Sequence, residues 1–168
     1  VRNAVTVCIS MPTITPCLWF DNDLEEAAQF YVSVFPNSSI EGFAPYTEAG
    51  PGETGSVAYG TFVLDGQRFM GINGGPHFQF TEAVSFEVRC ADQAEVDYYW
   101  DALRADGGEE SQCGWLKDRF GLSWQIVPER LYELVSDPDH ARADAANKAM
   151  YGMRKIVVAD LEAAVAAV

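Results

Sequence analysis

The feature that most constrains this fold is a repeat in the order of its elements. An apolar run leads into an acidic helix start in "CLWFDNDLEEAAQFY" (17–31), and the same order returns in "FEVRCADQAEVDYYW" (86–100). A single fixed offset places Asp23 on Asp92, and it also aligns a glutamate and a pair of aromatic residues. The ends of the two copies, "DGQRFMGI" and "DRFGLSWQIV", are also alike. Recurrence in one order favours a duplicated folding unit over two unrelated halves.

Hydrophobic periodicity assigns the elements within each copy. In the first copy, residues 13–20 have the pattern of a strand and residues 21–35 that of a helix with acidic residues in its first turn. A possible strand (38–46), a loop (48–55) and a hairpin around Asp65-Gly66 follow. In the second copy we expect a strand, a helix, a strand or loop and a last strand, at 83–90, 91–108, 112–118 and 121–128.

We therefore predict an α+β fold of tandem βαβββ modules with a helical C-terminal appendage. The chain of 168 residues has the length of a single domain, 1–168, with a real core. Its expected parts are a first module at 12–75, a second module at 80–128, a mainly helical extension at 129–168 and an N-terminal extension at 1–11 of little functional weight. Met11 directly precedes the first strong strand pattern and is the expected natural start.

Charge and composition limit the partners of this chain. It carries 11 Lys plus Arg against 25 Asp plus Glu, for a net charge of −14. Such a surface repels phosphate backbones and anionic lipid, so we expect neither nucleic acid nor a membrane as a partner. The four cysteines (Cys8, Cys17, Cys90 and Cys113) lack Cys-x-x-Cys spacing. This spacing argues against a structural zinc site and predicts reduced thiols in a cytoplasmic protein.

Several phrases of the chain resemble one known family. They are "ITPCLWF", "AAQFYVSVFPNS", "NGGPHFQF", "QAEVDYYWDAL" and "GEESQCGWLKDRFGLSWQIVP". They resemble the PhnB-like subgroup of the vicinal oxygen chelate superfamily, which includes glyoxalase I, extradiol dioxygenases and bleomycin-resistance proteins. Members of this subgroup are often labelled 3-demethylubiquinone-9 3-methyltransferase. The resemblance implies sheets that curl around a cavity and chains that pair as a homodimer.

The resemblance also locates the ligands of metal-dependent relatives, which place His, Gln or Glu on the first and last strands of each half. The corresponding residues here are Pro16, Met70, Ser85 (or Ala83) and Gln125. A proline side chain has no donor atom, a thioether suits soft copper, and the remaining oxygens are weak neutral donors. A catalytic divalent site needs roughly three good protein ligands. We therefore predict no metal and no cofactor.

Histidines and glycine pairs offer no alternative chemistry. Neither His77 nor His140 falls at a ligand position, and we expect His77 to make one local hydrogen bond. The glycine pair at 74–75 opens a linker, and the pair at 107–108 ends a helix. Neither pair is the strand-to-helix turn on which most methyltransferases hold S-adenosylmethionine. Methyltransferase activity is therefore not expected, despite the label.

Alternation along the strands predicts which side chains face the helices. The expected core residues are Trp19, Val84, Phe86, Val88, Leu122, Trp124 and Ile126. The expected cavity face holds Pro16, Leu18, Phe20, Met70, Ile72, Ser85, Glu87, Ser123, Gln125 and Val127. In the resembled fold, the first and last strands of the second half are neighbours, which would place Glu87 beside Gln125. A mostly apolar pocket with a few polar groups is typical of a small-molecule site.

Glu87 is the candidate catalytic residue, because an enclosed carboxyl group suits a general base or a proton donor. The alternatives are exposure to solvent or an ion pair with an arginine such as Arg68. The candidate ligand-binding residues are Phe20, Met70, Ser85, Cys113, Trp115, Phe120, Ser123 and Gln125. For Gln125 the alternative is an interior amide bonded to backbone, and for Cys113 it is a buried thiol. For Trp115 and Phe120 the alternative is ordinary packing.

The leading functional hypothesis is a PhnB-like protein that binds a small organic ligand in a cavity, as a binding protein or a metal-independent enzyme. One alternative is a ligand-sequestering protein of the bleomycin-resistance type without turnover. A second is a metal-dependent glyoxalase-type lyase or dioxygenase, which the missing ligands disfavour.

Overall fold

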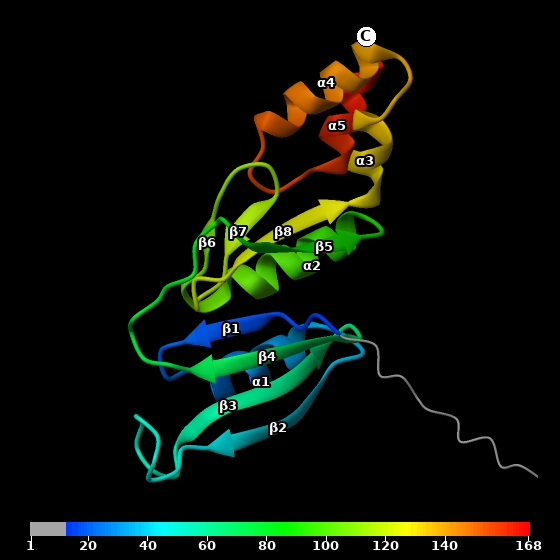
Figure 1. Ribbon diagram of the computed structural model, residues 1–168. Coiled ribbons are helices and arrows are strands. Elements are labelled where there is room, and N and C mark those ends of the chain that lie inside the picture. The colour runs from blue at the N-terminus through cyan, green and yellow to red at the C-terminus, as the bar shows by residue number, and fades with distance from the viewer. Residues whose placement is uncertain (1–12) are drawn as a thin grey trace, which may run out of the picture.

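The structure is a computed structural model that describes residues 13–168 (Figure 1). The predicted N-terminal extension and the predicted start at Met11 lie outside the described residues. Two four-stranded sheets, each with a packed helix, precede three final helices. Within residues 13–168, no helix combines the length and the apolar composition that crossing a membrane requires.

The first module packs one helix against one sheet. Its elements are β1 (Cys17–Phe20), α1 (Leu24–Val34), β2 (Ser39–Pro45), β3 (Val57–Leu64) and β4 (Gln67–Asn73). The strand order is β1-β4-β3-β2, with β1 parallel to β4 and the other pairs antiparallel. The β3–β4 hairpin turns at Asp65 and Gly66, which both have positive φ, as the Asp-Gly signal predicts.

The second module repeats this arrangement. Its elements are β5 (Ser85–Cys90), α2 (Gln93–Arg104), a 3-10 turn (Ala105–Gly107), β6 (Glu109–Glu110), β7 (Trp115–Lys117) and β8 (Ser123–Pro128). The strand order is β5-β8-β7-β6, again with the first strand parallel to the last. Asp92 caps α2 by accepting a hydrogen bond from the Glu95 amide at 3.0 Å. The matching topology of the two sheets confirms the predicted βαβββ duplication and the α+β fold class.

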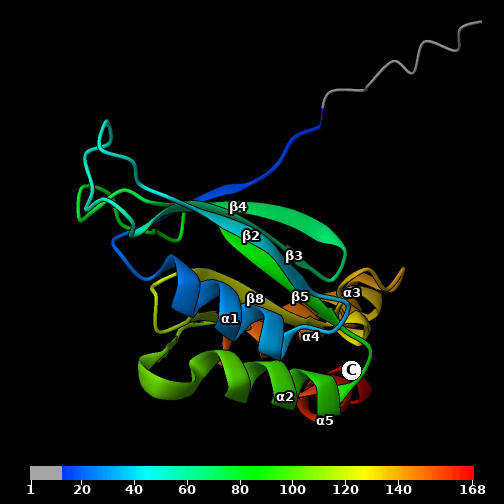
Figure 2. The same cartoon turned by 90° about the horizontal axis from the view of Figure 1, so that it is seen from below.

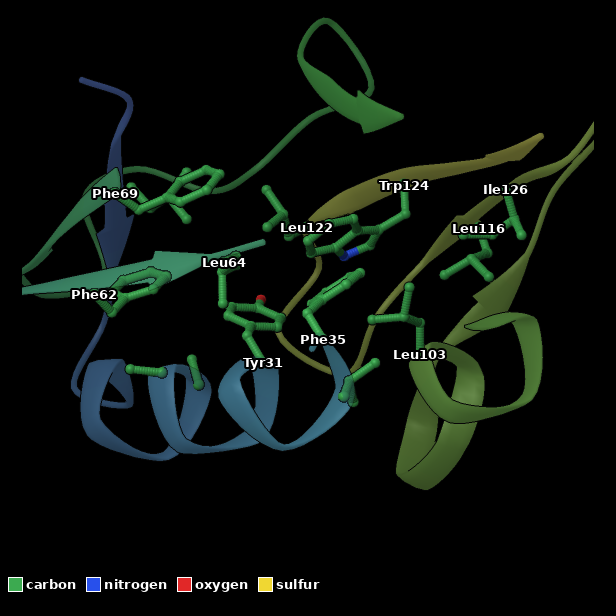
Figure 3. Packing of buried hydrophobic residues seen from close by; sticks show 14 of the residues in the cluster. Tyr31, Phe35, Phe62, Leu64, Phe69, Leu103, Leu116, Leu122, Trp124 and Ile126 are labelled. Atoms are coloured by element: carbon green, nitrogen blue, oxygen red, sulfur yellow. The ribbon is translucent and has the colours of Figure 1, made fainter. Parts of the chain in front are cut away.

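The two modules share one core. Both helices lie on the same side of the sheets, and the opposite sheet faces are left open (Figure 2). Tyr31 of α1 lies 5.5 Å from Trp124 of β8 between ring centroids, and Phe35 stacks on Trp124 at 5.2 Å (Figure 3). Phe69 of β4 meets Phe86 of β5 edge-on at 5.1 Å. Aromatic contacts therefore join the modules across their helix-facing sides.

The predicted orientation of β1 is wrong. Leu18 and Phe20 are buried on the helix side of the sheet. Leu18 is the register partner of Gly71 on β4, and Leu24 of α1 occupies the space that a side chain at Gly71 would need. The side of the sheet that Leu18 shares with Gly71 is therefore the side that α1 covers. Trp19 therefore points to the open face, where its indole nitrogen donates a hydrogen bond to the Gly75 carbonyl at 2.9 Å.

The predicted core side of the second sheet is confirmed with one exception. Leu122, Trp124 and Ile126 are buried, and Phe86 and Val88 pack against the core. The exception is Val84, which is 63% exposed. It lies outside the sheet, because β5 begins at Ser85.

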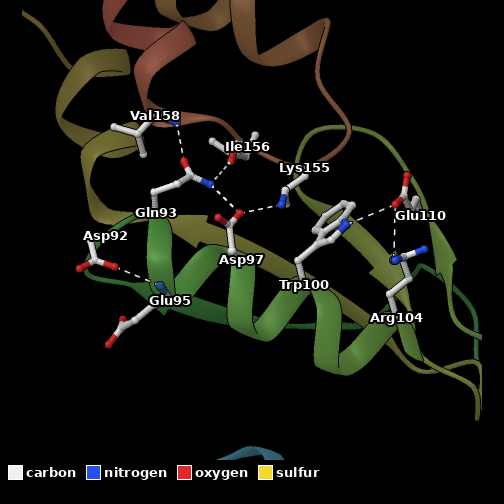
Figure 4. Close-up of polar contacts among 10 residues, drawn as sticks. All are labelled: Asp92, Gln93, Glu95, Asp97, Trp100, Arg104, Glu110, Lys155, Ile156 and Val158. Carbon is white, nitrogen blue, oxygen red and sulfur yellow. Dashed lines mark hydrogen bonds and ion pairs between the residues drawn. The ribbon is translucent and has the colours of Figure 1, made fainter. Parts of the chain in front are cut away.

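A helical extension follows the second module. It consists of α3 (Glu129–Val135), α4 (His140–Tyr151) and α5 (Val158–Ala166). Its own core contains Val127, Leu131, Leu134, Ala146, Ile156, Leu161 and Val165. Lys155 binds Asp97 of α2 at 2.6 Å, and the Gln93 side chain donates to the Ile156 carbonyl and accepts from the Val158 amide (Figure 4). The extension is therefore attached to the second module by both polar and apolar contacts.

Candidate functional site

A hollow of about 500 Å³ lies between the two modules, and we call it the inter-module cleft. Five aromatic residues line it: Phe35, Phe69, Phe86, Tyr99 and Trp124. Four charged residues also border it: Asp65, Glu87, Arg89 and Glu95, of which Glu87 and Arg89 belong to the edge strand β5. The size and the mixture of an apolar wall with a few polar groups match those of small-molecule sites.

The pairing of β5 with β8 builds one wall of the inter-module cleft. Phe86 and Trp124 are register partners on the helix-facing side, and Phe69 contributes from β4 across the module boundary. The Trp124 ring is fixed, because its indole nitrogen donates to the Asp118 carboxylate at 2.8 Å. The cleft therefore has a rigid aromatic wall at its inner end.

Glu87 stands on β5 between the inter-module cleft and the open face of the second sheet. Its Oε1 accepts a hydrogen bond from Arg89 Nε at 3.2 Å, and its Oε2 accepts one from the Tyr132 hydroxyl at 2.6 Å. The alternative of an ion pair with an arginine therefore describes Glu87, but the partner is Arg89, because Arg68 pairs with Glu41. Both carboxylate oxygens of Glu87 are therefore engaged, which holds the group in one orientation.

Tyr132 is a site residue that the sequence did not reveal. It lies on α3 of the extension, and the Arg89 guanidinium stacks over its ring at 4.9 Å from the centroid. The hydrogen bond to Glu87, partial burial and the negative charge of Glu87 raise the pKa of the Tyr132 phenol. No local pattern in "ERLYELV" signals this contact, because it depends on how the extension docks.

We expect Glu87→Gln to lower the pKa of Tyr132, because the neutral amide removes the carboxylate that favours the protonated phenol. Arg89→Gln should raise that pKa further, since the guanidinium stabilises the phenolate. Titration of the Tyr132 ring carbon by NMR, assigned through Tyr132→Phe, measures both shifts. Identical Tyr132 titration curves in the wild type and Glu87→Gln would contradict this contact.

Three other predicted site residues meet on the open face of the second sheet. Glu87 is the register partner of Gln125, as predicted, and Ser85 is the partner of Ser123. The Gln125 amide nitrogen donates to the Ser85 hydroxyl at 2.8 Å. Gln125 therefore bonds to a side chain, and the alternative of an amide tied to backbone does not describe this bond.

The remaining predicted ligand residues lie elsewhere. Phe20 and Phe120 meet at 6.5 Å beside a second hollow of about 400 Å³ at the end of β1. Trp115 is half-buried on the open face of the second sheet, opposite Gln125, and Met70 is on the open face of the first sheet. Cys113 is half-buried in a turn, and its amide donates to the Met153 carbonyl of the extension at 2.8 Å. The structure therefore distributes these residues over several surfaces instead of one pocket.

Comparison with known proteins identifies the family. The family model described as 3-demethylubiquinone-9 3-methyltransferase matches residues 12–127. The chain belongs to this family. The PhnB protein from Bacillus cereus is 37% identical over 70% of this chain and 99% of its own, with a TM-score of 0.63. No protein with a curated description matches the chain.

Beyond this family, the chain is similar to other solved structures in fold. The genomically encoded fosfomycin resistance protein FosX from Listeria monocytogenes has a TM-score of 0.51. It is 16% identical, over 74% of this chain and 98% of its own. PhnB and FosX belong to the vicinal oxygen chelate superfamily, so the resemblance stated from the sequence is confirmed.

The extension lies outside the part of the chain that the family model matches. The model ends at residue 127, and α3 begins at Glu129. Nearly all of the Bacillus cereus chain is already used in matching 70% of this one. Tyr132 therefore lies outside the matched region, and it contacts a residue, Glu87, that lies inside it.

The side chains at the metal-ligand positions of the superfamily do not fit a divalent cation. Met70 offers a thioether on one sheet, while Ser85 and Gln125 on the other sheet are bonded to each other. The described part of the chain contains no group of three His, Cys, Asp or Glu side chains arranged to hold a metal ion. His77 and His140 are exposed. This family member therefore lacks the donor set that a catalytic metal would need.

Proposed function

We propose that this protein binds a small organic molecule in the inter-module cleft without a catalytic metal. The observation that carries the proposal is the cleft itself, an aromatic-walled hollow with Glu87 held at its edge by Arg89 and Tyr132. The wall provides apolar contact area, and the charged edge orients a polar group of the ligand. Methyl transfer is not part of this proposal, because neither glycine pair forms the turn that would hold S-adenosylmethionine.

Two versions of this function differ in the role of Glu87. In a metal-independent enzyme, Glu87 moves a proton of the bound substrate. In a sequestering protein of the bleomycin-resistance type, Glu87 only orients the ligand. The second version is favoured because each carboxylate oxygen already accepts one hydrogen bond, from Arg89 or from Tyr132, which holds the group in a fixed orientation.

Ligand capture followed by turnover analysis tests the proposal. The protein is incubated with a small-molecule extract of the cells that produce it, and native mass spectrometry identifies what is retained at one molecule per chain. For the sequestering version we expect unaltered ligand, with Glu87→Gln weakening its retention about three- to tenfold. For the enzyme version, Glu87→Gln should lower turnover by about a hundredfold or more. Failure to retain any molecule, or a divalent metal retained at one ion per chain, would contradict the proposal.

We also propose that two copies pair and that the protein works in the cytoplasm. The open face of the first sheet leaves apolar side chains uncovered, including Tyr59, which is 47% exposed, and the half-buried Met70 and Ile72. A second copy that covers this face would remove that surface from water. Light scattering that gave the monomer mass would contradict the pairing. The cytoplasmic location rests on the unpaired thiols of Cys17, Cys90 and Cys113.

A further inference from the structure

We propose that a hollow beside Ser123 binds the primary carboxamide group of a small molecule. This hollow of about 110 Å³ lies on the open face of the second sheet, and we call it the Ser123 hollow. Ser123 and Trp115, two residues that the sequence predicted as ligand contacts, both line it. Phe86 and Trp124 face the opposite, helix-covered side of the same sheet. The proposal therefore does not rest on the function proposed for the inter-module cleft.

The observation that carries the proposal is the Ser123 hydroxyl. Ser123 is 1% exposed, and its Oγ has no hydrogen-bond partner among residues 13–168. The hydroxyl of its register partner Ser85 already accepts a hydrogen bond from Gln125. A buried polar group without a partner destabilises a folded chain, so such groups are usually satisfied by an ordered water molecule or a ligand. The hollow has the volume of about three to four water molecules at about 30 Å³ each, which is also the room that a carboxamide group needs.

The polar groups of the Ser123 hollow differ in depth. Lys117 is the register partner of Ser123 on β7, and its side chain is 32% exposed, so a hydroxyl and an ammonium group are the inner donors. The outer groups are carboxylates. Glu82 pairs with Lys117 at 2.6 Å through a side chain that is 62% exposed, and Glu109 is exposed. An acceptor atom therefore fits the inner end of the hollow, and N–H donors fit the outer end.

A primary carboxamide provides both kinds of group in one plane. Its carbonyl oxygen accepts from Ser123 and Lys117, while its amino group donates towards Glu82 and Glu109. Trp115 gives this plane a flat apolar wall. A carboxylate would instead bring a negative charge to two glutamates, and an amidinium group would place N–H donors against the Lys117 ammonium.

The turn that precedes this wall is fixed by the helical extension. The amides of Cys113 and Gly114 donate to the carbonyls of Met153 and Arg154, at 2.8 Å and 2.7 Å. Trp115 follows this turn directly as the first residue of β7. A wall that is already held in place loses little conformational freedom when a ligand binds.

Three planar probes of nearly equal size test the proposal: acetamide, acetate and acetamidinium. Each is titrated into the full chain, and its dissociation constant is taken from the indole N–H signal of Trp115 in ¹H–¹⁵N correlation spectra, assigned through Trp115→Phe. We expect acetamide to bind in the millimolar range, as suits so small a ligand. It should bind about fivefold more tightly than either acetate or acetamidinium.

Variants assign this preference to the Ser123 hollow. Ser123→Ala should weaken acetamide binding about three- to tenfold. It should not lower the midpoint of thermal unfolding, because the hydroxyl has no hydrogen bond to lose within the described part of the chain. Lys117→Gln should make acetamidinium bind more tightly than acetamide, since the two glutamates then face no cation. Ser136→Ala, at an exposed serine that follows α3, is the matched control and should change neither binding nor the midpoint.

The possible results decide between the carboxamide, another ligand class and a structural role. Tightest binding of acetate or acetamidinium by the wild type, or equal binding of all three probes, would overturn the carboxamide. Acetamide binding that Ser123→Ala leaves unchanged, or a Trp115 signal that no probe moves, would overturn the site itself. A lower thermal midpoint for Ser123→Ala would also overturn it, because the hydroxyl would then serve the fold through an ordered water molecule. The proposed function stands in every case, because Trp115 does not line the inter-module cleft.

Discussion

Asp118→Ala should lower the free energy of unfolding by about 4 kcal/mol, the largest effect expected from one substitution in this chain. Asp118 is 3% exposed and accepts four hydrogen bonds. Oδ2 accepts from the Tyr31 hydroxyl at 2.7 Å and the Trp124 indole at 2.8 Å, and Oδ1 accepts from the amides of Phe120 and Leu122. Alanine would leave these donors buried without an acceptor, at a cost of about 1–3 kcal/mol for each buried group.

The position of Asp118 explains why the effect should exceed that of an ordinary lost hydrogen bond. Tyr31 belongs to the first module, whereas Asp118 and Trp124 belong to the second. The carboxylate therefore ties the modules together beneath the inter-module cleft. Burial and the neighbouring Asp118 raise the pKa of Tyr31 well above its ordinary value, so the phenol remains a donor at neutral pH.

Urea denaturation of three variants provides the measurement. Asp118→Asn keeps one carbonyl oxygen and should cost about half as much as Asp118→Ala. Asp144→Ala removes an exposed carboxylate from α4 and should change the free energy of unfolding by less than about 0.5 kcal/mol. If Asp118→Ala and Asp144→Ala had the same denaturation midpoint, the proposed role of Asp118 would be wrong.

The duplicated fold was predictable from the sequence because its signals are local. Asp92 has the geometry of a helix cap, and Asp65-Gly66 turns the hairpin as the dipeptide predicts. The orientation of β1 was not predictable in the same way. Leu18, Trp19 and Phe20 are all apolar, so a period of two residues does not say which side is inward. The choice is made by Gly71, which gives α1 its approach to the sheet.

The candidate site was also predictable where it depends on strand pairing and not where it depends on contacts between distant segments. The placement of Glu87 beside Gln125 follows from the pairing of the first and last strands of a module, and the structure confirms it. Phe86 and Trp124 were correctly assigned to the core, yet the sequence did not reveal that the core opens into a cleft there. The contact of Tyr132 with Glu87 joins segments that only the docking of the extension brings together.

Ile156→Ala should destabilise the protein by about 2–4 kcal/mol, the expected cost of a cavity at a fully buried aliphatic residue. Ile156 packs in the core of the extension, and its carbonyl accepts a hydrogen bond from Gln93 of α2.

Two spectroscopic signals measure this effect in different parts of the chain. All four tryptophans lie within the modules, so tryptophan fluorescence reports the modules, while far-UV circular dichroism also reports the three helices of the extension. If the extension and modules unfold together, both signals should shift equally, and Val168→Ala at the exposed C-terminal residue should shift neither. If only the dichroism signal shifts, the extension opens alone, the prediction of a single domain is wrong, and Tyr132 leaves Glu87 whenever it opens.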